Sequence, residues 1–152
     1  MANYDFKQDL VVGEQGETVI MDDLISLGAK FIDDNKDNKY DLLMEKGGKQ
    51  IKYEIKTDVY CKPTYDTGNM FIEFECRGKA SGILVTQANW FVMYYKHLKE
   101  AWYIKTEDLK NIVENEDNNI RITQFSGDSG SNTRGYLVPR HKYQEKFIVR
   151  TI

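Results

Sequence analysis

The sequence predicts an α/β fold in which helices flank a mixed central β-sheet. Three patterns support this fold class: a helical stripe of apolar residues in segment 14–27, two β-rich runs that meet at Gly47-Gly48, and a further pair of aromatic runs within residues 90–104. At 152 residues the chain is long enough to bury a hydrophobic core. We therefore expect residues 1–152 to form a single domain.

The composition indicates a folded protein that works in the cytoplasm. Hydrophobic residues make up 41% of the chain and charged residues 30%, a balance that disordered proteins do not have. No apolar run approaches the length of a membrane span, and the amino terminus lacks the basic-then-apolar order of a secretory signal, so we expect no membrane partner. The formal net charge of -3 does not favour a nucleic-acid partner, and the distribution of charge matters more than its sum.

The first predicted helix runs from about residue 14 to residue 27. The residues of its stripe at helical spacing are Glu17, Ile20, Leu24 and Leu27. Glu17 therefore points inward at the start of the helix. Glu14 lies one turn earlier, where an acid interacts favourably with the positive end of the helix dipole without any catalytic role. A polar connection, residues 33–39, then leads into the first pair of strands.

The two runs that meet at Gly47-Gly48 predict a β-hairpin, because glycine tolerates the positive φ of a two-residue turn. In that register Lys46 pairs with Lys49, and Asp41 lies directly opposite Glu54. With a side-chain period of 2, Asp41, Glu54 and Lys56 share one face of the hairpin. The other face is apolar and carries Tyr40, Leu42, Met44, Ile51, Tyr53 and Ile55.

Opposed carboxylates repel unless a cation lies between them, so this face predicts a divalent metal site. Carboxylate oxygens suit Mg²⁺ or Mn²⁺, and the carbonyl oxygen of Ile55 is a further candidate ligand. Lys56 can hold an attacking water or neutralise charge on a phosphate in the transition state. The alternative is an ordinary amphipathic hairpin whose outer face carries solvated charges.

Asp41, Glu54 and Lys56, preceded by an acidic helix, resemble the PD-(D/E)XK nuclease superfamily, which includes restriction endonucleases, phage nucleases and Holliday-junction resolvases. Tyr40 stands where the proline of that motif would be. The resemblance extends more weakly to residues 68–73 and 82–90, and it covers about residues 9–105.

The resemblance implies a restriction-endonuclease-like core and a Mg²⁺-dependent endodeoxyribonuclease, encoded by a phage or mobile element, in which Mn²⁺ can replace Mg²⁺. A first-helix glutamate often adds a metal contact in such families, which makes Glu17 a candidate ligand and Glu14 a weaker one. Dimer contacts vary among them, and a homodimer is compatible with this prediction. The alternatives are a catalytically silent DNA-binding or assembly module with a nuclease-like fold, and an RNA-acting or exonucleolytic relative.

The remaining elements are predicted from turn-forming residues and from the periodicity of apolar residues. Residues 62–69 form a loop, and residues 70–76 alternate as a strand whose Glu73 is a weak candidate for the margin of the site. Residues 90–96 and 101–104 form a second hairpin with core aromatic rings. The last predicted elements are a helix at 106–115 with Thr106 as N-cap, a strand at 120–125, and a Gly/Ser-rich loop at 126–133 that could close over substrate.

The carboxy-terminal segment 129–152 is basic and aromatic. Its cations face only Glu145 in the local sequence, and they alternate with rings able to stack on sugars or bases. The segment therefore predicts a DNA-contacting edge, the alternative being a terminal strand with solvated charges. The candidate DNA-binding residues are Arg134, Arg140, Lys142 and Lys146, and His141 is a candidate phosphate contact on the surface. Cys61 and Cys76 lack clustered partners of a zinc site, so we expect free thiols.

Overall fold

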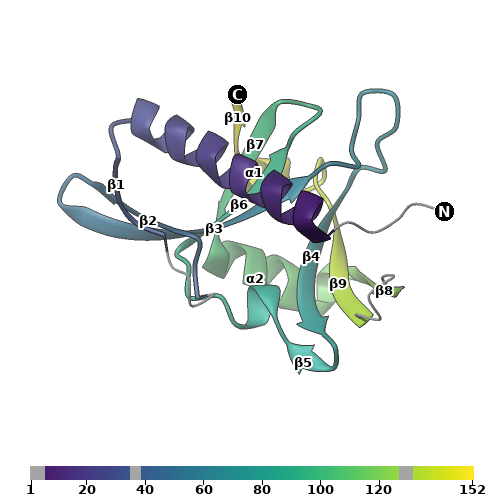
Figure 1. The fold of residues 1–152 in the computed structure, drawn as a ribbon. Coiled ribbons are helices and arrows are strands. Elements are labelled where there is room, and N and C mark those ends of the chain that lie inside the picture. Colours follow the sequence, from purple (N-terminus) through teal and green to yellow (C-terminus); the bar gives the residue numbers. More distant parts are fainter. Residues whose placement is uncertain (1–5, 35–38, 127–131) are drawn as a thin grey trace.

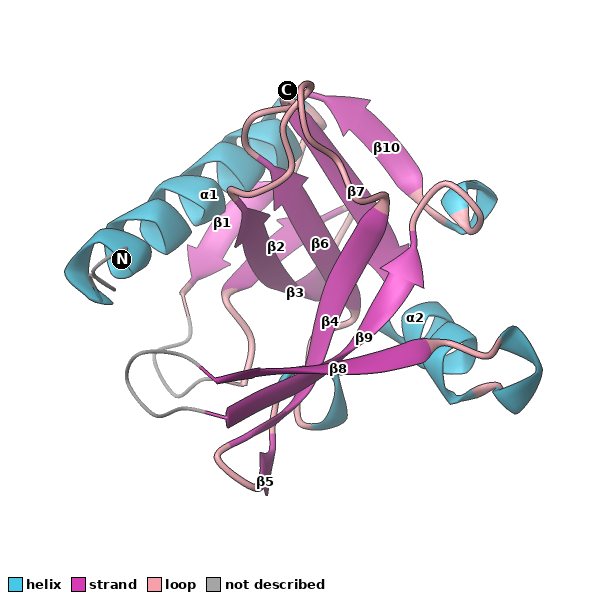
Figure 2. Cartoon of the chain, turned by 90° about the vertical axis from the view of Figure 1, so that its right-hand side faces the viewer, coloured by secondary structure: helices cyan, strands magenta, loops and turns pink. Residues whose placement is uncertain are grey.

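The computed structural model describes residues 6–34, 39–126 and 132–152. The strands of this part form a six-stranded sheet and a four-stranded sheet (Figures 1 and 2). Most of the predicted 33–39 connection and of the predicted closing loop at 126–133 lies outside the described residues. Within the described residues, no helix is long and apolar enough to cross a membrane.

The six-stranded sheet is mixed, as predicted. Its spatial order is β1-β2-β3-β6-β7-β10, in which β3 and β6 are parallel and the other neighbours are antiparallel. The bounds of its strands are β1 Lys30–Asp33, β2 Leu42–Lys46, β3 Lys49–Asp58, β6 Trp90–Tyr95, β7 Glu100–Lys105 and β10 Ile148–Thr151.

The four-stranded sheet was not predicted. It is antiparallel, with the order β5-β4-β9-β8. Its strands are β4 Asn69–Cys76, β5 Lys79–Ala80, β8 Arg121–Ser126 and β9 Asn132–Pro139. Short 3₁₀ turns lie at Gly82–Leu84, Glu116–Asn118 and Gln144–Lys146.

Two hydrophobic cores cover the two faces of the six-stranded sheet. On one face, α1 (Phe6–Ser26) contributes Ile20 and Leu24 to a core shared with the apolar face of the β2–β3 hairpin. On the other face, α2 (Thr106–Glu114) and the buried face of β4 enclose rings of β6 and β7. In Figure 1, α1 runs across one side of the sheet and α2 lies on the other. The predicted α/β class, a mixed sheet flanked by helices, is confirmed.

The first hairpin has the predicted register. Lys46 pairs with Lys49 and Leu42 with Tyr53, and both turn glycines have positive φ, 59° at Gly47 and 77° at Gly48. The second hairpin, β6–β7, is also confirmed, and its rings are core residues rather than an exposed platform.

Both helix starts differ from the prediction. α1 begins at Phe6 and ends at Ser26, so Glu14 and Glu17 lie in its interior and Leu27 is exposed beyond its end. The prediction that Glu14 interacts with the helix amino terminus is therefore wrong. For α2 the N-cap residue is Lys105, and Thr106 is already helical and buried.

α1 approaches β3 most closely at Gly16. A Cβ atom at this position would lie 1.9 Å from Oγ1 of Thr57, a distance that no side chain can occupy. The bare backbone of Gly16 therefore lets the helix sit low on the strand, and Gly16 fixes the height of its neighbour Glu17 above the sheet.

Candidate active site

The candidate site forms where β3 loses its partner β2. β2 begins at Leu42, opposite Tyr53, so the end of β3 pairs only with β6 on its other side. Asp41 lies immediately before β2, and its N–H donates to the carbonyl oxygen of Tyr53 at 2.8 Å. The result is an open strand edge beside Asp41.

The side chain of Asp41 holds this edge by a backbone contact. Its Oδ2 accepts a hydrogen bond from the N–H of Ile55 at 2.7 Å. The last ladder pair is Leu42–Tyr53, so the predicted direct pairing of Asp41 with Glu54 is replaced by this bond to the next residue. Because the N–H and C=O of a strand residue point to the same edge, the Ile55 carbonyl oxygen also faces the open edge where Asp41 lies.

Glu54 and Lys56 lie on the opposite face of β3 from the apolar residues that contact α1, as predicted. Lys56 Nζ is 3.2 Å from Glu54 Oε1, and Lys56 keeps 45% of its side chain exposed while Glu54 keeps 11%. The hydroxyl of Thr86 donates to Glu54 Oε2 at 3.1 Å. Glu54 is therefore a nearly buried carboxylate with a partner on each oxygen.

Sequence reasoning did not identify Thr86 as a site residue. It lies in the segment before β6 that carried the weaker part of the family resemblance. The adjacent Gln87 N–H donates to the carbonyl of Lys39 at 2.8 Å, which brings this segment against the chain that leads to Asp41. Thr86 contacts Glu54 across 32 positions of sequence, a distance that a local pattern does not cover.

Glu17 on α1 belongs to the same electrostatic environment. Burial raises its pKa from 4.5 to about 7, and the carboxylate that adds most to the shift is Asp41. Burial likewise raises the pKa of Asp41 to about 6, with Glu54 adding to it and the Ile55 N–H opposing it. Glu14 is exposed and contributes less to the Glu17 shift than Asp41 does. The charges of Asp41 and Glu54 thus act on Glu17, as the prediction of Glu17 as the inward-facing acid requires.

Lys56 is held as a cation by this environment. Desolvation lowers its pKa, but the Glu54 and Asp41 carboxylates raise it further, so the net shift is upward. A protonated lysine between acids can bind a phosphate oxygen or a water, and it donates protons rather than accepting them at neutral pH.

The donor set fits a hard cation bound by few protein ligands. Among the described residues, no group of three or more His, Cys, Asp or Glu side chains converges closely enough to enclose an ion. Mg²⁺ needs only one or two carboxylates because water and phosphate complete its octahedron. In number and type, Asp41 and Glu54 with the Ile55 carbonyl fit that requirement, and burial first, with neighbouring carboxylates adding to it, raises the pKa of both Asp41 and Glu17.

Glu73 lies at the margin of this site. Together with Lys56 it lines a pocket of about 290 Å³ between β3 and β4. Its Oε2 accepts a hydrogen bond from the hydroxyl of Ser81 at 2.9 Å, so it is not a free strand acid on the surface.

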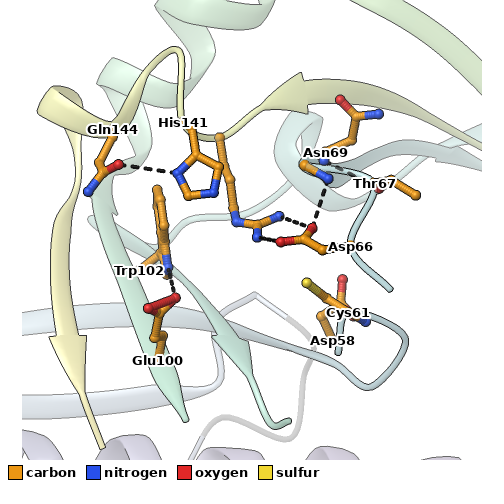
Figure 3. Close-up of polar contacts among 11 residues, drawn as sticks. Asp58, Cys61, Asp66, Thr67, Asn69, Glu100, Trp102, His141 and Gln144 are labelled. Atoms are coloured by element: carbon orange, nitrogen blue, oxygen red, sulfur yellow. Dashed lines mark hydrogen bonds and ion pairs between the residues drawn. The ribbon is translucent and has the colours of Figure 1, made fainter. Parts of the chain in front are cut away.

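Arg140 does not lie on a DNA-contacting edge, which corrects that prediction. It is 2% exposed and forms a two-point ion pair with Asp66 on the β3–β4 loop. Its guanidinium lies 4.9 Å from the ring centroid of Tyr95 and 5.8 Å from that of Trp102. In Figure 3, Asp66 lies beside Cys61 and on the far side of the cluster from His141. Arg140 therefore links the β3–β4 loop to the hydrophobic core that contains Tyr95 and Trp102.

Two further basic residues of the segment, Arg134 and Arg150, also have distant partners. Arg134 Nη1 is 3.5 Å from Glu75 Oε2, and Arg150 binds Asp23 of α1 through two nitrogens. Lys142 and Lys146 are exposed, so they keep the predicted capacity to contact phosphate. Acidic residues from other parts of the chain thus neutralise several cations of this segment, which the local sequence does not show.

The cysteines and histidine agree with the sequence interpretation. Cys61 is buried and Cys76 half-buried, and both are free thiols. Burial raises the pKa of the Cys61 thiol to about 11, which makes it a poor nucleophile. His141 is exposed, and its ring packs edge-on against Trp102 (Figure 3).

Comparison with known proteins finds similarity only in structure. No family model matches the sequence, and no curated protein matches it. The fold is similar to that of a bacterial homing endonuclease, I-Ssp6803I, with a TM-score of 0.51 at 14% sequence identity. The matched region covers 64% of this chain and 69% of that chain. The fold of this protein is therefore nuclease-like.

Proposed function

We propose that this protein is a divalent-metal-dependent endodeoxyribonuclease of the PD-(D/E)XK type. The observation that carries the proposal is the placement of Asp41, Glu54 and Lys56 together at the open edge of β3. Glu17 lies within electrostatic reach of the same carboxylates. The similarity of the fold to that of a homing endonuclease supports DNA as the substrate.

In this proposal Mg²⁺ or Mn²⁺ is held by Asp41, Glu54 and the Ile55 carbonyl, with Glu17 as an outer carboxylate. Such an ion lowers the pKa of a bound water and neutralises charge on the phosphate. The Ile55 N–H keeps one oxygen of Asp41 turned toward β3, and its other oxygen has no hydrogen bond among the described residues. Thr86 orients Glu54 in the same way from the β6 side.

Lys56 supplies a positive charge from the protein, in addition to that of the metal ion. Nearly half of its side chain is exposed, at 45%, while its Nζ contacts Glu54, so we expect it to bind a phosphate oxygen without leaving the carboxylate. A fixed cation at the position where negative charge grows stabilises the transition state more than the ground state. Lysine is suited to this role as a compact charge with rotatable donors.

The proposal is tested by incubating the protein with supercoiled plasmid, linear duplex and branched DNA in Mg²⁺ or in EDTA. Cleavage that needs Mg²⁺ and is lost in Lys56→Ala, but kept in Lys49→Ala on the same strand, supports it. Lys49 is an exposed residue of the turn and is the matched control. Metal-independent cutting, or wild-type rates in Lys56→Ala, would refute it. The phage or mobile-element origin remains a prediction of the sequence resemblance.

One observation favours the second candidate, a catalytically silent DNA-binding or assembly module. Both oxygens of Glu54 already have protein partners, Lys56 and Thr86, so its charge is offset without a metal. A silent module would bind DNA in the presence and absence of Mg²⁺ and cut none of the substrates. Binding measured beside cleavage separates the two functions.

A further inference from the structure

A pocket of about 290 Å³ opens beside Lys56, between the end of β3 and the face of β4 that points away from the core. Its volume lies at the low end of the range for ligand pockets, which is roughly 300–1,000 Å³, so it suits one ring system rather than an extended ligand. Its lining residues include Lys56, Tyr60, Phe71, Glu73, Phe91 and Phe125.

The pocket is lined largely by aromatic residues, and its apolar side chains differ in how exposed they are. Phe91 and Met93 of β6 are buried and form a fixed floor. Tyr60, on the β3–β4 loop, is 83% exposed, and Phe125 of β8 is 54% exposed. Both exposed rings border the same pocket, so a flat aromatic ligand in it can contact both.

The position of the Phe71 ring depends on the absence of a side chain at Gly135. A Cβ atom at Gly135 of β9 would lie 2.4 Å from this ring, so glycine is needed there for the ring to lie over the strand. Phe71 then meets Phe125 edge to face, with ring centroids 5.0 Å apart. The aromatic wall is therefore held by contacts across three strands.

The polar groups of the pocket are arranged by charge. Asp58 turns into its own loop, where its Oδ1 accepts the N–H groups of Tyr60 and Cys61. Glu73 also lines the pocket; its Oε2 accepts the Ser81 hydroxyl, and its Oε1 has no hydrogen bond among the described residues. Lys56 lines the same pocket as the rings, and Phe91 and Met93 lie next to it on the neighbouring strand β6. A nucleotide has the matching form, with a charged phosphate next to a flat ring that carries hydrogen-bond donors.

We propose that this pocket receives a single nucleobase, unstacked from the DNA strand that passes Lys56. The inference rests on the proposed function, because it takes the phosphate at Lys56 to belong to DNA. A base inside an intact duplex cannot reach such a pocket, so the favoured substrates have an unpaired or easily extruded nucleotide beside the cleaved phosphate. Stacking on aromatic side chains supplies the affinity.

Glu73 adds a preference among bases. A carboxylate accepts hydrogen bonds from an exocyclic amino group, which cytosine and adenine have and thymine lacks. An unpaired cytosine or adenine should therefore bind more tightly than an unpaired thymine, and Glu73→Gln should reduce that difference.

Binding is tested with short duplexes that carry one unpaired cytosine, one abasic nucleotide at the same place, or no unpaired position. The Asp41→Asn protein is used so that binding is measured without cleavage, by fluorescence anisotropy. We expect about tenfold tighter binding of the unpaired base than of the abasic site, within the range for one stacked base. Tyr60→Ala and Phe125→Ala, added separately, should remove this difference, whereas Tyr60→Phe should keep it.

Tyr65→Ala is the matched control. Tyr65 lies on the same loop and is 69% exposed, but it does not line the pocket. Equal affinities for the base and the abasic site, or the same loss in Tyr65→Ala as in Tyr60→Ala, would overturn the pocket inference. Cleavage by the wild-type protein is scored separately: a protein that cuts no DNA but prefers the unpaired base refutes the nuclease and keeps the pocket, and the reverse result refutes the pocket alone.

Discussion

Replacing Asp41 by Asn should stabilise the metal-free protein at neutral pH. Asn has nearly the same shape and keeps an oxygen that can accept the Ile55 N–H, so the hydrogen bond at 2.7 Å is preserved. The substitution removes the charge that burial and Glu54 disfavour. Natural sites that trade stability for function respond in this way.

The magnitude follows from the pKa of Asp41. The rise from 3.8 to about 6 corresponds to about 3 kcal/mol at 1.36 kcal/mol per pKa unit. Solvent reaches part of this side chain and screens the charge, so we expect about 1.5 kcal/mol. For a chain of 152 residues this gain raises the melting temperature by about 3–6 °C.

The sign depends on pH in a defined window. Because the pKa of Asp41 is higher in the folded protein, the folded state binds the proton more tightly than the unfolded chain. Wild-type stability therefore falls as pH rises from 3.8 to about 6, and the penalty is complete above that range. The advantage of Asp41→Asn should be absent near pH 4, grow across the window, and stay constant above it.

The assay is thermal melting from pH 4 to pH 8 in EDTA, with and without added Mg²⁺ or Mn²⁺. Asp22→Asn on the exposed face of α1 is the control, since it removes one charge outside the site. An Asp41→Asn protein that is less stable at pH 7.5, or a difference that does not change with pH, would refute the reasoning. We also expect either metal to stabilise the wild type but not Asp41→Asn, through mass action.

Four further predictions concern the site, the buried ion pair of Arg140, the exposed basic residues and the contact between α1 and β3. Glu17→Gln should reduce metal-dependent cleavage more than Glu14→Gln, because Asp41 adds to the raised pKa of Glu17; the opposite order in side-by-side rates would transfer the role to Glu14. Arg140→Ala should lower the free energy of unfolding by about 3 kcal/mol in urea titrations, since it breaks a buried ion pair, and a loss under about 0.5 kcal/mol would contradict the structural role. Lys142→Ala with Lys146→Ala should flatten the log–log salt dependence of DNA binding by about 0.9 for each phosphate that the protein no longer neutralises, and an unchanged slope would place DNA elsewhere. Gly16→Ala should destabilise by about 1–3 kcal/mol and be partly rescued by Thr57→Ala, which removes the Oγ1 atom 1.9 Å from the new Cβ; no rescue in the double mutant would mean that another contact sets the helix height.

The sequence predicts the hairpin and its site best because their signals are local. A glycine pair fixes the turn, a period of 2 separates the faces, and together they place Glu54 and Lys56 opposite the apolar residues. The start of α1 was missed although Asp5, a residue type favoured at helix N-caps, directly precedes Phe6, because Gly13 is a poor helix former and the prediction began after it. The missed four-stranded sheet depends on pairing between β4 and β9, which are distant in sequence.

Arg140 shows why the basic segment misled a prediction from local charge. Counting charges within residues 129–152 finds only Glu145 to oppose the cations. The actual partner, Asp66, lies 74 positions away and meets Arg140 only once β4 and β9 have paired. The same limit applies to Thr86 and to the aromatic pocket, whose walls come from separate strands and one loop.

The ion pair between Arg140 and Asp66 and the carboxylates of the candidate site titrate in different pH ranges. The Arg140 hydrogen bonds hold the pKa of Asp66 far below its ordinary value, so this link keeps its full strength above about pH 4. Asp41 and Glu17, in contrast, change charge near their pKa values of about 6 and about 7. Mild acid therefore removes the charges of Asp41 and Glu17 while the loop that carries Tyr60 stays bound to the core through Asp66 and Arg140. Lowering the pH is thus a reversible way, without mutation, to change the charge that the site presents to a phosphate. The aromatic pocket that includes Tyr60 keeps its structure under the same conditions.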